Sequence, residues 1–331
     1  MALVIRLDLL CRPSATTRHQ KGIDGFFNVN NERKGTMKTT QIALMMGIVL
    51  MTTTGLQADT SVFGSIEQGL QVSDNGTSKI VANGTIVGAK FNTDIGTATE
   101  EASGPRVFGT ISADIDPSGP NALTTRDAFV GIGTGPVSLS LGRMRNLQET
   151  ISGATVGIFG EGTDLLSRNS TRNSNTAKLS FALNDDINIA ASTVVDGSNG
   201  KSGMDSWEIG YSHTLFGVNL VSAYAKNNNT GTRTMLGGAT TDVGPVTVGG
   251  IYERDKNSAG TSTDSLTGVA SIDVGKVTLK GGYQTIEGGA DSYLAEAEHS
   301  FSSAASAYVN GKHINDTSDT NVYTVGFRYS F

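Results

Sequence analysis

The residues best placed to do chemistry in this chain are charged side chains around one long glycine-rich segment. The segment spans residues 147–171, and its acids are Glu149, Glu161 and Asp164. Three bases, Arg106, Arg172 and Lys178, lie in alternating segments and share their phase with small polar residues. Because side chains of a strand point alternately to two faces, these bases belong to a polar face. Acids on the segment and bases on the strands would set an electric field across any passage between them.

Arg126 is a fourth base that could join this group, and alternation alone does not decide its face. Its phase mates Ala128, Val130 and Ile132 are apolar, so a regular strand would turn Arg126 to the apolar side and Asp127 to the polar side. The residues alone do not decide whether Arg126 or Asp127 points to the polar face.

Enzymatic constellations find little support in the sequence. The histidines downstream of residue 58 are His213, His299 and His313. The first two lie in apolar phases, where a catalytic base would face lipid or a neighbouring subunit. The glycine-rich run 131–135 precedes a strand and not the helix that a nucleotide loop needs, and the acids at 185–186 and 205 lack calcium-loop spacing. We therefore expect no enzyme, no metal site and no cofactor.

Composition and periodicity predict an all-β chain. The 331 residues include 42 Gly and only 6 Pro, 17% are charged and the mean hydropathy is -0.13, which fits neither a helical membrane protein nor a charged disordered chain. From residue 60 on, segments of roughly ten alternating residues are separated by Gly, Asn, Asp and Ser clusters. We count sixteen strands, near 60–73, 83–94, 106–116, 123–134, 136–146, 175–184, 186–196, 204–215, 217–227, 232–243, 245–255, 264–274, 276–287, 291–301, 303–314 and 321–331.

Connection lengths favour a transmembrane barrel over a soluble sandwich. The turns after even-numbered strands are mostly minimal, as at Thr134-Gly135 and Gly244-Pro245, whereas the connections after odd-numbered strands are longer and polar, as at 228–231. Short turns on one rim, longer loops on the other and an even strand count are typical of antiparallel barrels in outer membranes.

The phase of the strands also predicts which residues meet the membrane. In the last strand Phe327, Tyr329 and Phe331 share one apolar face, which we expect to contact lipid at a membrane rim. Arg143 follows Leu139 and Leu141 in such a face. A cation there costs about 2–4 kcal/mol near the midplane of a barrel wall. We therefore expect Arg143 to meet a partner, unless it already lies in water at the rim.

The first 58 residues are predicted to lie outside the barrel. Residues 42–51 (IALMMGIVLM) are too short to span a bilayer as a helix. They fit the core of a signal peptide of residues 37–58, with Lys38 in its basic start and Ala58 at the cleavage site. We interpret residues 1–36 as upstream sequence translated from a misassigned start codon, and a disordered extension is the alternative. The mature barrel would then span 59–331.

The predicted mature chain is acidic. Residues 1–58 hold seven of the 25 Lys+Arg and three of the 31 Asp+Glu, which leaves 18 against 28 and a net charge of -10. This balance suggests no nucleic-acid surface. The only cysteine, Cys11, precedes the barrel, so backbone pairing and not a disulfide framework must hold the fold.

Three segments resemble the Gram-negative general diffusion porins, and the similarity extends over the whole mature chain. They are residues 125–132 (TRDAFVGI) leading to Leu141-Gly142-Arg143, then Arg172-Asn173-Ser174, and the terminal Tyr329-Ser330-Phe331. The resemblance implies a homotrimer of sixteen-stranded barrels whose third loop folds into the lumen. It turns Arg126 inward, and it puts Arg143 at the subunit interface. It also makes Tyr329 and Phe331 the signal that the barrel-assembly machinery recognises.

The function that this resemblance implies is a water-filled porin for passive diffusion of ions and small hydrophilic solutes through the outer membrane of a Gram-negative bacterium. Outer-membrane lipid would surround the barrel. The expected pore constriction consists of Arg106, Arg126, Arg172, Lys178, Glu161 and Asp164. Two alternatives stay open: a substrate-specific outer-membrane channel, and a secreted β-rich adhesin, which would need neither Phe331 nor the unequal connections.

Overall fold

The fold is that of a computed structural model, which describes residues 59–82, 84–95, 104–116, 123–159, 172–195 and 203–331. The chain divides into two units, residues 1–43 and 44–331, and the described residues belong to the second unit. The predicted signal peptide and the segment before it lie outside the described residues.

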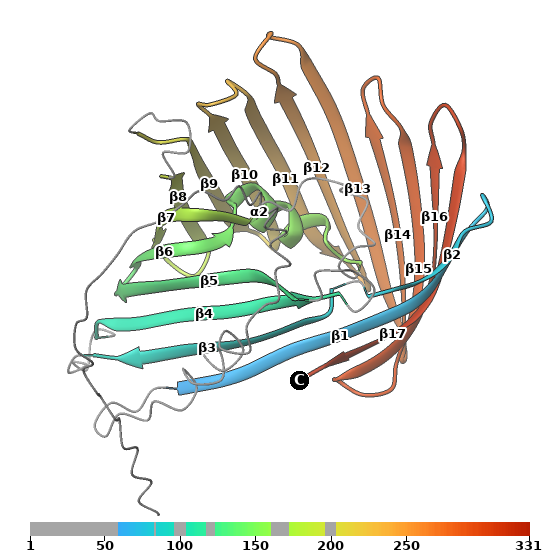
Figure 1. Cartoon of the computed structure of the whole chain (residues 1–331), viewed down its shortest axis with the longest axis horizontal. Coiled ribbons are helices and arrows are strands. Elements are labelled where there is room, and N and C mark those ends of the chain that lie inside the picture. Colours follow the sequence, from blue (N-terminus) through green and yellow to red (C-terminus); the bar gives the residue numbers. More distant parts are fainter. Residues whose placement is uncertain (1–58, 83, 96–103, 117–122, 160–171, 196–202) are drawn as a thin grey trace, which may run out of the picture. The chain divides into compact units, whose positions relative to one another are not determined.

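The described residues form seventeen strands and one helix (Figure 1). The strands are β1 (Asp59–Ser73), β2 (Ser78–Val81), β3 (Ile86–Asp94), β4 (Arg106–Ile115), β5 (Leu123–Thr134), β6 (Val137–Arg145), β7 (Arg172–Ala182), β8 (Ile187–Val194), β9 (Ser206–Leu215), β10 (Val218–Asn227), β11 (Arg233–Val243), β12 (Val246–Lys256), β13 (Ser262–Val274), β14 (Val277–Ile286), β15 (Asp291–Ser300), β16 (Ala305–Asn315) and β17 (Thr320–Ser330). The helix is α2 (Leu147–Val156).

The strands close into one antiparallel barrel. Each strand from β3 to β17 pairs with the next, and β1 pairs with β17, with Leu70 opposite Val325. Both β2 and β3 pair with β1, so together they form a single wall strand that is interrupted at residues 82–85. The wall therefore has sixteen strands, which confirms the predicted fold class and count.

The interruption between β2 and β3 adds one residue to the second wall strand. Gly69 of β1 lies opposite Val81, whereas Ser65 lies opposite Ile86. Thr85 bridges the gap: its Oγ1 accepts from the Glu67 amide at 3.1 Å and donates to the Glu67 carbonyl at 3.0 Å. The second wall strand begins at residue 78 and not near 83 as predicted, because this bulge breaks the alternation on which the prediction depended.

The two faces of the wall differ as a membrane barrel requires. On the outer face large apolar side chains are exposed, including Val325 (54%) and Phe327 (66%), whereas polar side chains of the inner face are buried, including Glu67 (5%) and Thr324 (3%). Tyr329 and Phe331 also lie on the outer face and are half exposed. The predicted apolar phase of the last strand is confirmed.

The connections also follow the predicted pattern in the described part of the chain. Two-residue turns join four pairs of strands, at Gly135-Pro136, Phe216-Gly217, Gly244-Pro245 and Gly275-Lys276. Each has a glycine at positive φ, which the preferred hairpin turns require. The opposite rim carries longer connections, such as 228–232 and 257–261. None of the helices in the described ranges has the length and apolar character needed to span a bilayer.

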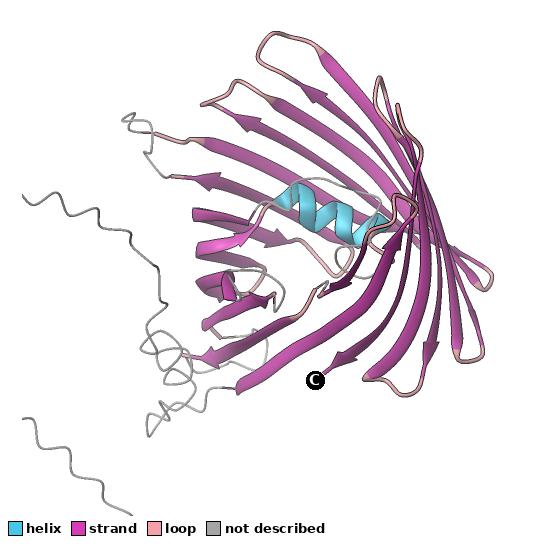
Figure 2. Ribbon diagram, turned by 45° about the vertical axis from the view of Figure 1, so that its right-hand side comes forward, coloured by secondary structure: helices cyan, strands magenta, loops and turns pink. Residues whose placement is uncertain are grey.

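Helix α2 lies on the inner side of the barrel wall (Figure 2). It contacts β8 through β13 and belongs to the connection between β6 and β7. A long loop was expected between these two strands, and residues 147–156 of that connection form a helix. The helix has only ten residues, too few for its period to stand out against the surrounding glycines.

Candidate functional site

The start of α2 is held by a cap and by a carboxylate of the wall. Asn146 is the N-cap, and its Oδ1 accepts from the Glu149 amide at 2.7 Å. The Leu147 amide donates to Glu208 Oε2 on β9 at 2.6 Å. Free amides and the helix dipole both favour negative charge at this end. The wall thus fixes where the connection enters the barrel.

Two glycines of the inner wall form the seat of α2. A Cβ on Gly210 of β9 would lie 2.8 Å from Ile151 Cδ1, and a Cβ on Gly249 of β12 would overlap the Thr155 carbonyl oxygen. Beside it, Thr240 Oγ1 of β11 donates to the Thr155 carbonyl at 3.1 Å. A larger side chain at either glycine would push the helix away from the wall.

An apolar cluster inside the barrel fastens the same segment. Ile151, Val156 and Phe159 pack against buried inner-wall side chains of β10 to β13 and of β15. These are Val221, Ala223, Leu236, Ile251, Val269 and Leu294. Inner walls of water-filled barrels are otherwise polar, so this patch marks the place where the connection is docked.

Charged residues join the start of α2 to the wall, in a group that we call the α2 cluster: Asp114, Arg126, Asp127, Arg145, Glu149 and Arg172. Glu149 Oε1 lies 3.1 Å from Arg145 Nε and 3.7 Å from Arg172 Nη1. Arg172 Nε lies 3.2 Å from Asp127 Oδ1, and Arg126 Nη1 lies 2.6 Å from Asp114 Oδ1. The ion pairs form a continuous chain from β4 to the helix.

A β-bulge explains how Arg126 reaches this cluster. The register between β4 and β5 shifts between Ile111 and Ala113, so β5 carries one extra residue at this point. The bulge changes the phase, and both Arg126 and Asp127 lie on the inner face, with Asp127 accepting a hydrogen bond from Ser112 Oγ. Strict alternation had allowed only one of the two to point inward.

The structure brings together only some of the residues predicted for the constriction. Arg126 and Arg172 belong to the α2 cluster, and Lys178 lies close enough to Asp127 and Glu208 to interact electrostatically. Arg106 lies apart, because it pairs with Gly133 at the other end of β5, roughly 20 Å along the strand from Arg126. Glu161 and Asp164 fall outside the described residues.

Arg143 finds partners in its own chain. Its Nε donates to the Thr125 carbonyl at 3.1 Å, and its Nη1 donates to Ser174 Oγ at 3.1 Å. Next to it the register between β6 and β7 shifts, and Asn175 adopts a φ of 54°. The expected partner is therefore at least partly intramolecular, and the predicted interface role stays a prediction.

A second charged group, which sequence reasoning missed, crosses the line where the barrel closes. We call it the seam cluster: Glu67, Lys280, Glu296, Glu298 and Arg328. Arg328 Nη1 lies 2.9 Å from both Glu296 Oε1 and Glu298 Oε2, and its Nε lies 3.3 Å from Glu67 Oε2. Lys280 Nζ lies 2.9 Å from Glu296 and 2.6 Å from Glu298. A polar phase shared across β1, β14, β15 and β17 is the signal that could have found it.

Tyr308 of β16 completes the packing around the seam cluster. The Arg328 guanidinium carbon lies 3.9 Å from the centre of its ring, within the range of a cation–π contact. Asn310 Nδ2 donates to Glu296 Oε2 at 3.2 Å, and Ser306 Oγ donates to Glu298 Oε1 at 2.5 Å. Five strands on the inner wall are thus tied together.

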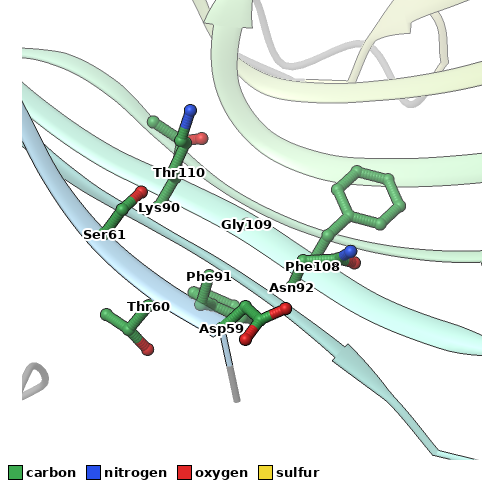
Figure 3. Close-up of a pocket in the computed structure, with 9 residues that line it drawn as sticks. All are labelled: Asp59, Thr60, Ser61, Lys90, Phe91, Asn92, Phe108, Gly109 and Thr110. Atoms are coloured by element: carbon green, nitrogen blue, oxygen red, sulfur yellow. The ribbon is translucent and has the colours of Figure 1, made fainter.

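A hollow of about 520 Å³ lies where β1, β3 and β4 run side by side (Figure 3). Its charged members are Asp59 and Lys90, and Phe91 and Phe108 also belong to its lining. Within the described ranges, no three His, Cys, Asp or Glu side chains are grouped as a metal site would need. We assign no chemistry to this hollow.

A closed antiparallel barrel with an apolar outer face, a charged inner wall and an inward segment defines the class of outer-membrane channels. Solved structures share this fold at low identity. An anion-selective porin from Comamonas acidovorans has a TM-score of 0.67 and 15% identity, covering 83% of this chain and 100% of its own. A loop-deletion mutant of OmpT from Vibrio cholerae has a TM-score of 0.67 and 14% identity, covering 83% of this chain and 99% of its own. OmpF from Salmonella typhi in complex with daunomycin has a TM-score of 0.65 and 15% identity, covering 82% of this chain and 97% of its own.

The chain belongs to the Gram-negative porin family, whose profile matches residues 43–331. No curated protein sequence matches the chain. Family membership confirms the predicted porin function: the protein is a diffusion channel of the outer membrane and not an enzyme.

Proposed function

We propose that solutes are selected where the connection after β6 approaches the wall formed by β4 to β9. The observation that carries this proposal is the α2 cluster, in which Glu149 of the helix pairs with Arg145 and Arg172. A segment fixed by ion pairs and by an apolar seat narrows the lumen without closing it. Ions and small hydrophilic solutes then diffuse through the remaining water-filled space.

The charges beside the passage would act through their field. Arg126, Arg172 and Lys178 supply positive charge on the wall, and Glu161 and Asp164 of the connection would supply negative charge to the passage. In a lumen with low-dielectric walls such a field orients polar solutes at the expense of apolar ones. Asp114 and Asp127 stand next to the bases and weaken the field. The net charge of -10 for residues 59–331 favours a mild cation preference.

Reversal potentials across planar bilayers in a salt gradient test this proposal. Neutralising Glu161 and Asp164 together should shift the reversal potential toward anion preference. Neutralising Arg172 and Lys178 together should shift it toward cation preference. Arg106→Gln is the matched control, because Arg106 lies far along the strand, and it should cause the smaller shift. If neither double variant changes the reversal potential or the conductance, the connection does not line the pore.

We propose further that three copies of the chain assemble, with Arg143 near the subunit contact. A solved structure of Vibrio cholerae OmpT is described as a trimer form, and Arg143 lies on the outer face of β6, one of the first wall strands. Arg143→Ala should lower the temperature at which trimers dissociate on gels. An unchanged dissociation temperature would limit Arg143 to its bonds with Thr125 and Ser174.

Export and assembly form the third part of the proposal. Cleavage after Ala58 would leave Asp59, the first residue of β1, at the N-terminus of the mature protein, and N-terminal sequencing tests it. Peptides from residues 1–36 in the unprocessed precursor would contradict the misassigned start. Tyr329 and Phe331 would be the signal for the barrel-assembly machinery, so deleting Phe331 should reduce assembled barrel far more than synthesis. Normal outer-membrane levels of the truncated chain would refute that role.

A further inference from the structure

A row of bases crosses the outer face of the barrel near the rim with the longer connections. Lys226 of β10 lies opposite Arg233 of β11, which lies opposite Lys256 of β12. Arg254 lies two residues before Lys256 on β12, and its Nη2 lies 2.7 Å from Asp264 Oδ2. These four bases gather on one part of a chain that is acidic as a whole.

Strand alternation places this row on the lipid-facing side. The bases share their phase with exposed apolar side chains of the same strands, Met235 (57%) on β11 and Tyr252 (44%) on β12. Among the described residues, no carboxylate lies within 4.0 Å of Lys226, Arg233 or Lys256. Three cations on a low-dielectric wall therefore have no carboxylate partner within the part of the chain that the structure describes.

An apolar groove runs directly below the bases. It has a volume of about 470 Å³, and its outward lining includes Ile209, Tyr211, Ser222, Tyr224, Met235, Gly237 and Tyr252. The pairing of Ser222 with Gly237 and of Gly237 with Tyr252 gives the groove a floor of small residues between larger walls. A Cβ on Gly237 would meet nothing within 4 Å, so the floor is open to a ligand.

Aromatic rings mark the depth of this region in the membrane. Trp207 and Tyr224 lie with their ring centres 5.2 Å apart, and Trp207 is opposite Lys226 in the register. Aromatic girdles of barrels sit at the interface between headgroups and acyl chains. The bases therefore lie at the depth of the lipid headgroups, and the groove lies at the depth of the acyl chains. The longer connections identify this rim as the extracellular one.

We propose that this outer face binds a lipid of the outer leaflet that carries phosphate groups and several acyl chains. Lys226, Arg233 and Lys256 hold the phosphates, with Arg233 able to contact one through two donors, and one acyl chain lies in the groove. The row crosses three strands and so spans roughly 10 Å, which suits a headgroup with two phosphates. The inference rests on the outer-membrane location, and it uses a face away from the proposed subunit contact on the first strands.

Trp207, the only tryptophan of the chain, gives a direct readout. The full-length mature protein in detergent is titrated with diphosphoryl lipid A while the fluorescence of Trp207 is followed. The triple variant Lys226→Gln, Arg233→Gln and Lys256→Gln should raise the Kd at least tenfold. The groove-filling variant Ser222→Leu and Gly237→Leu should also raise it. Lys276→Gln, in a turn at the opposite rim, is the matched control and should bind like the wild type.

Several results would overturn the lipid site. They are unchanged affinity of the triple variant, equal binding of dephosphorylated lipid A, or the same Trp207 response to inorganic pyrophosphate alone. Heat-modifiable migration on gels confirms that each variant is folded. Conductance in phosphatidylcholine bilayers separates the failure of the lipid site from the failure of the channel function. If the protein conducts but the variants bind lipid A like the wild type, only the lipid site is refuted. If the folded protein does not conduct, the channel function is refuted.

Discussion

The α2 cluster and the seam cluster are both built from carboxylates and bases on the inner wall, yet their exposure differs. In the α2 cluster the side-chain exposure ranges from 7% at Arg172 to 39% at Asp114. In the seam cluster it ranges from 0% at Glu296 to 17% at Glu298. Charges that reach the lumen act on passing solutes, whereas charges sealed against one another act on the wall. We therefore expect the α2 cluster to govern selectivity and the seam cluster to govern stability.

The largest effect should come from Arg328→Met in the seam cluster. It removes the cation that contacts Glu67, Glu296 and Glu298. Breaking a buried ion pair from one side costs about 3–5 kcal/mol, because the remaining charge stays buried. The urea concentration at the midpoint of unfolding measures the loss. Lys276→Met, in an exposed turn, is the control, and equal midpoints for both variants would refute a structural role.

The next effect concerns the seat of α2. Gly249→Val places atoms where the Thr155 carbonyl lies, and overpacking of this kind costs about 1–3 kcal/mol or displaces the neighbour. We expect a changed single-channel conductance. Gly250→Val is a matched control, because Gly250 faces outward and its Cβ would meet only the Thr267 carbonyl at 3.7 Å. Identical conductance of the two variants would mean that the seat does not shape the pore.

A smaller and more specific effect should follow from Asp127→Asn. This change removes the carboxylate beside Arg126 and Arg172, so that only Asp114 and Glu149 of the cluster still offset their positive charge. The reversal potential should move toward anion preference with little change in unfolding. Glu67→Gln in the seam cluster should do the opposite, lowering stability without moving the reversal potential. If both substitutions shift the potential equally, the two clusters do not differ in function.

The smallest effect should come from Asp74→Asn at the outer end of the same seam. The Asn321 amide and side chain donate to Asp74 Oδ2 at 2.9 and 2.8 Å, and these bonds lower the pKa of Asp74. Stabilisation by a group with a lowered pKa is present above its unfolded value of about 3.9 and is lost as the pH falls through the folded value. The variant should unfold slightly earlier than the wild type at pH 7, and this difference should vanish in acid. A difference that persists in acid would argue against the carboxylate.

The sequence predicted the architecture well because a barrel wall repeats one simple rule. Alternation and connection lengths were enough for the sixteen strands, the closed barrel and the outward phase of Phe327 and Tyr329. Errors arose where the repeat is interrupted. The bulge that brings Arg126 to the inner face, and the extra residue before β3, leave no mark in the alternation of apolar and polar residues.

The candidate site was less predictable, because its geometry depends on pairs that are distant in the sequence. The helix start had a local signal, since Asn146 followed by Glu149 resembles a capping box. The contacts of Leu147 with Glu208, and of Arg328 with Glu67, join strands whose register only the closed barrel defines. Arg106 shares its phase with the other bases but not its height on the wall, and alternation carries no information about height.

Closure of the barrel between β1 and β17 also has a consequence for the order of folding. The neighbouring hairpins form local contacts early, whereas pairing of the first and last strands closes a loop that contains nearly the whole chain. Four members of the seam cluster lie on β14, β15 and β17 and can meet as the final hairpins form. Glu67 arrives only with β1. The last hairpins therefore carry a preassembled, incomplete set of charges, and the arrival of the first strand completes it.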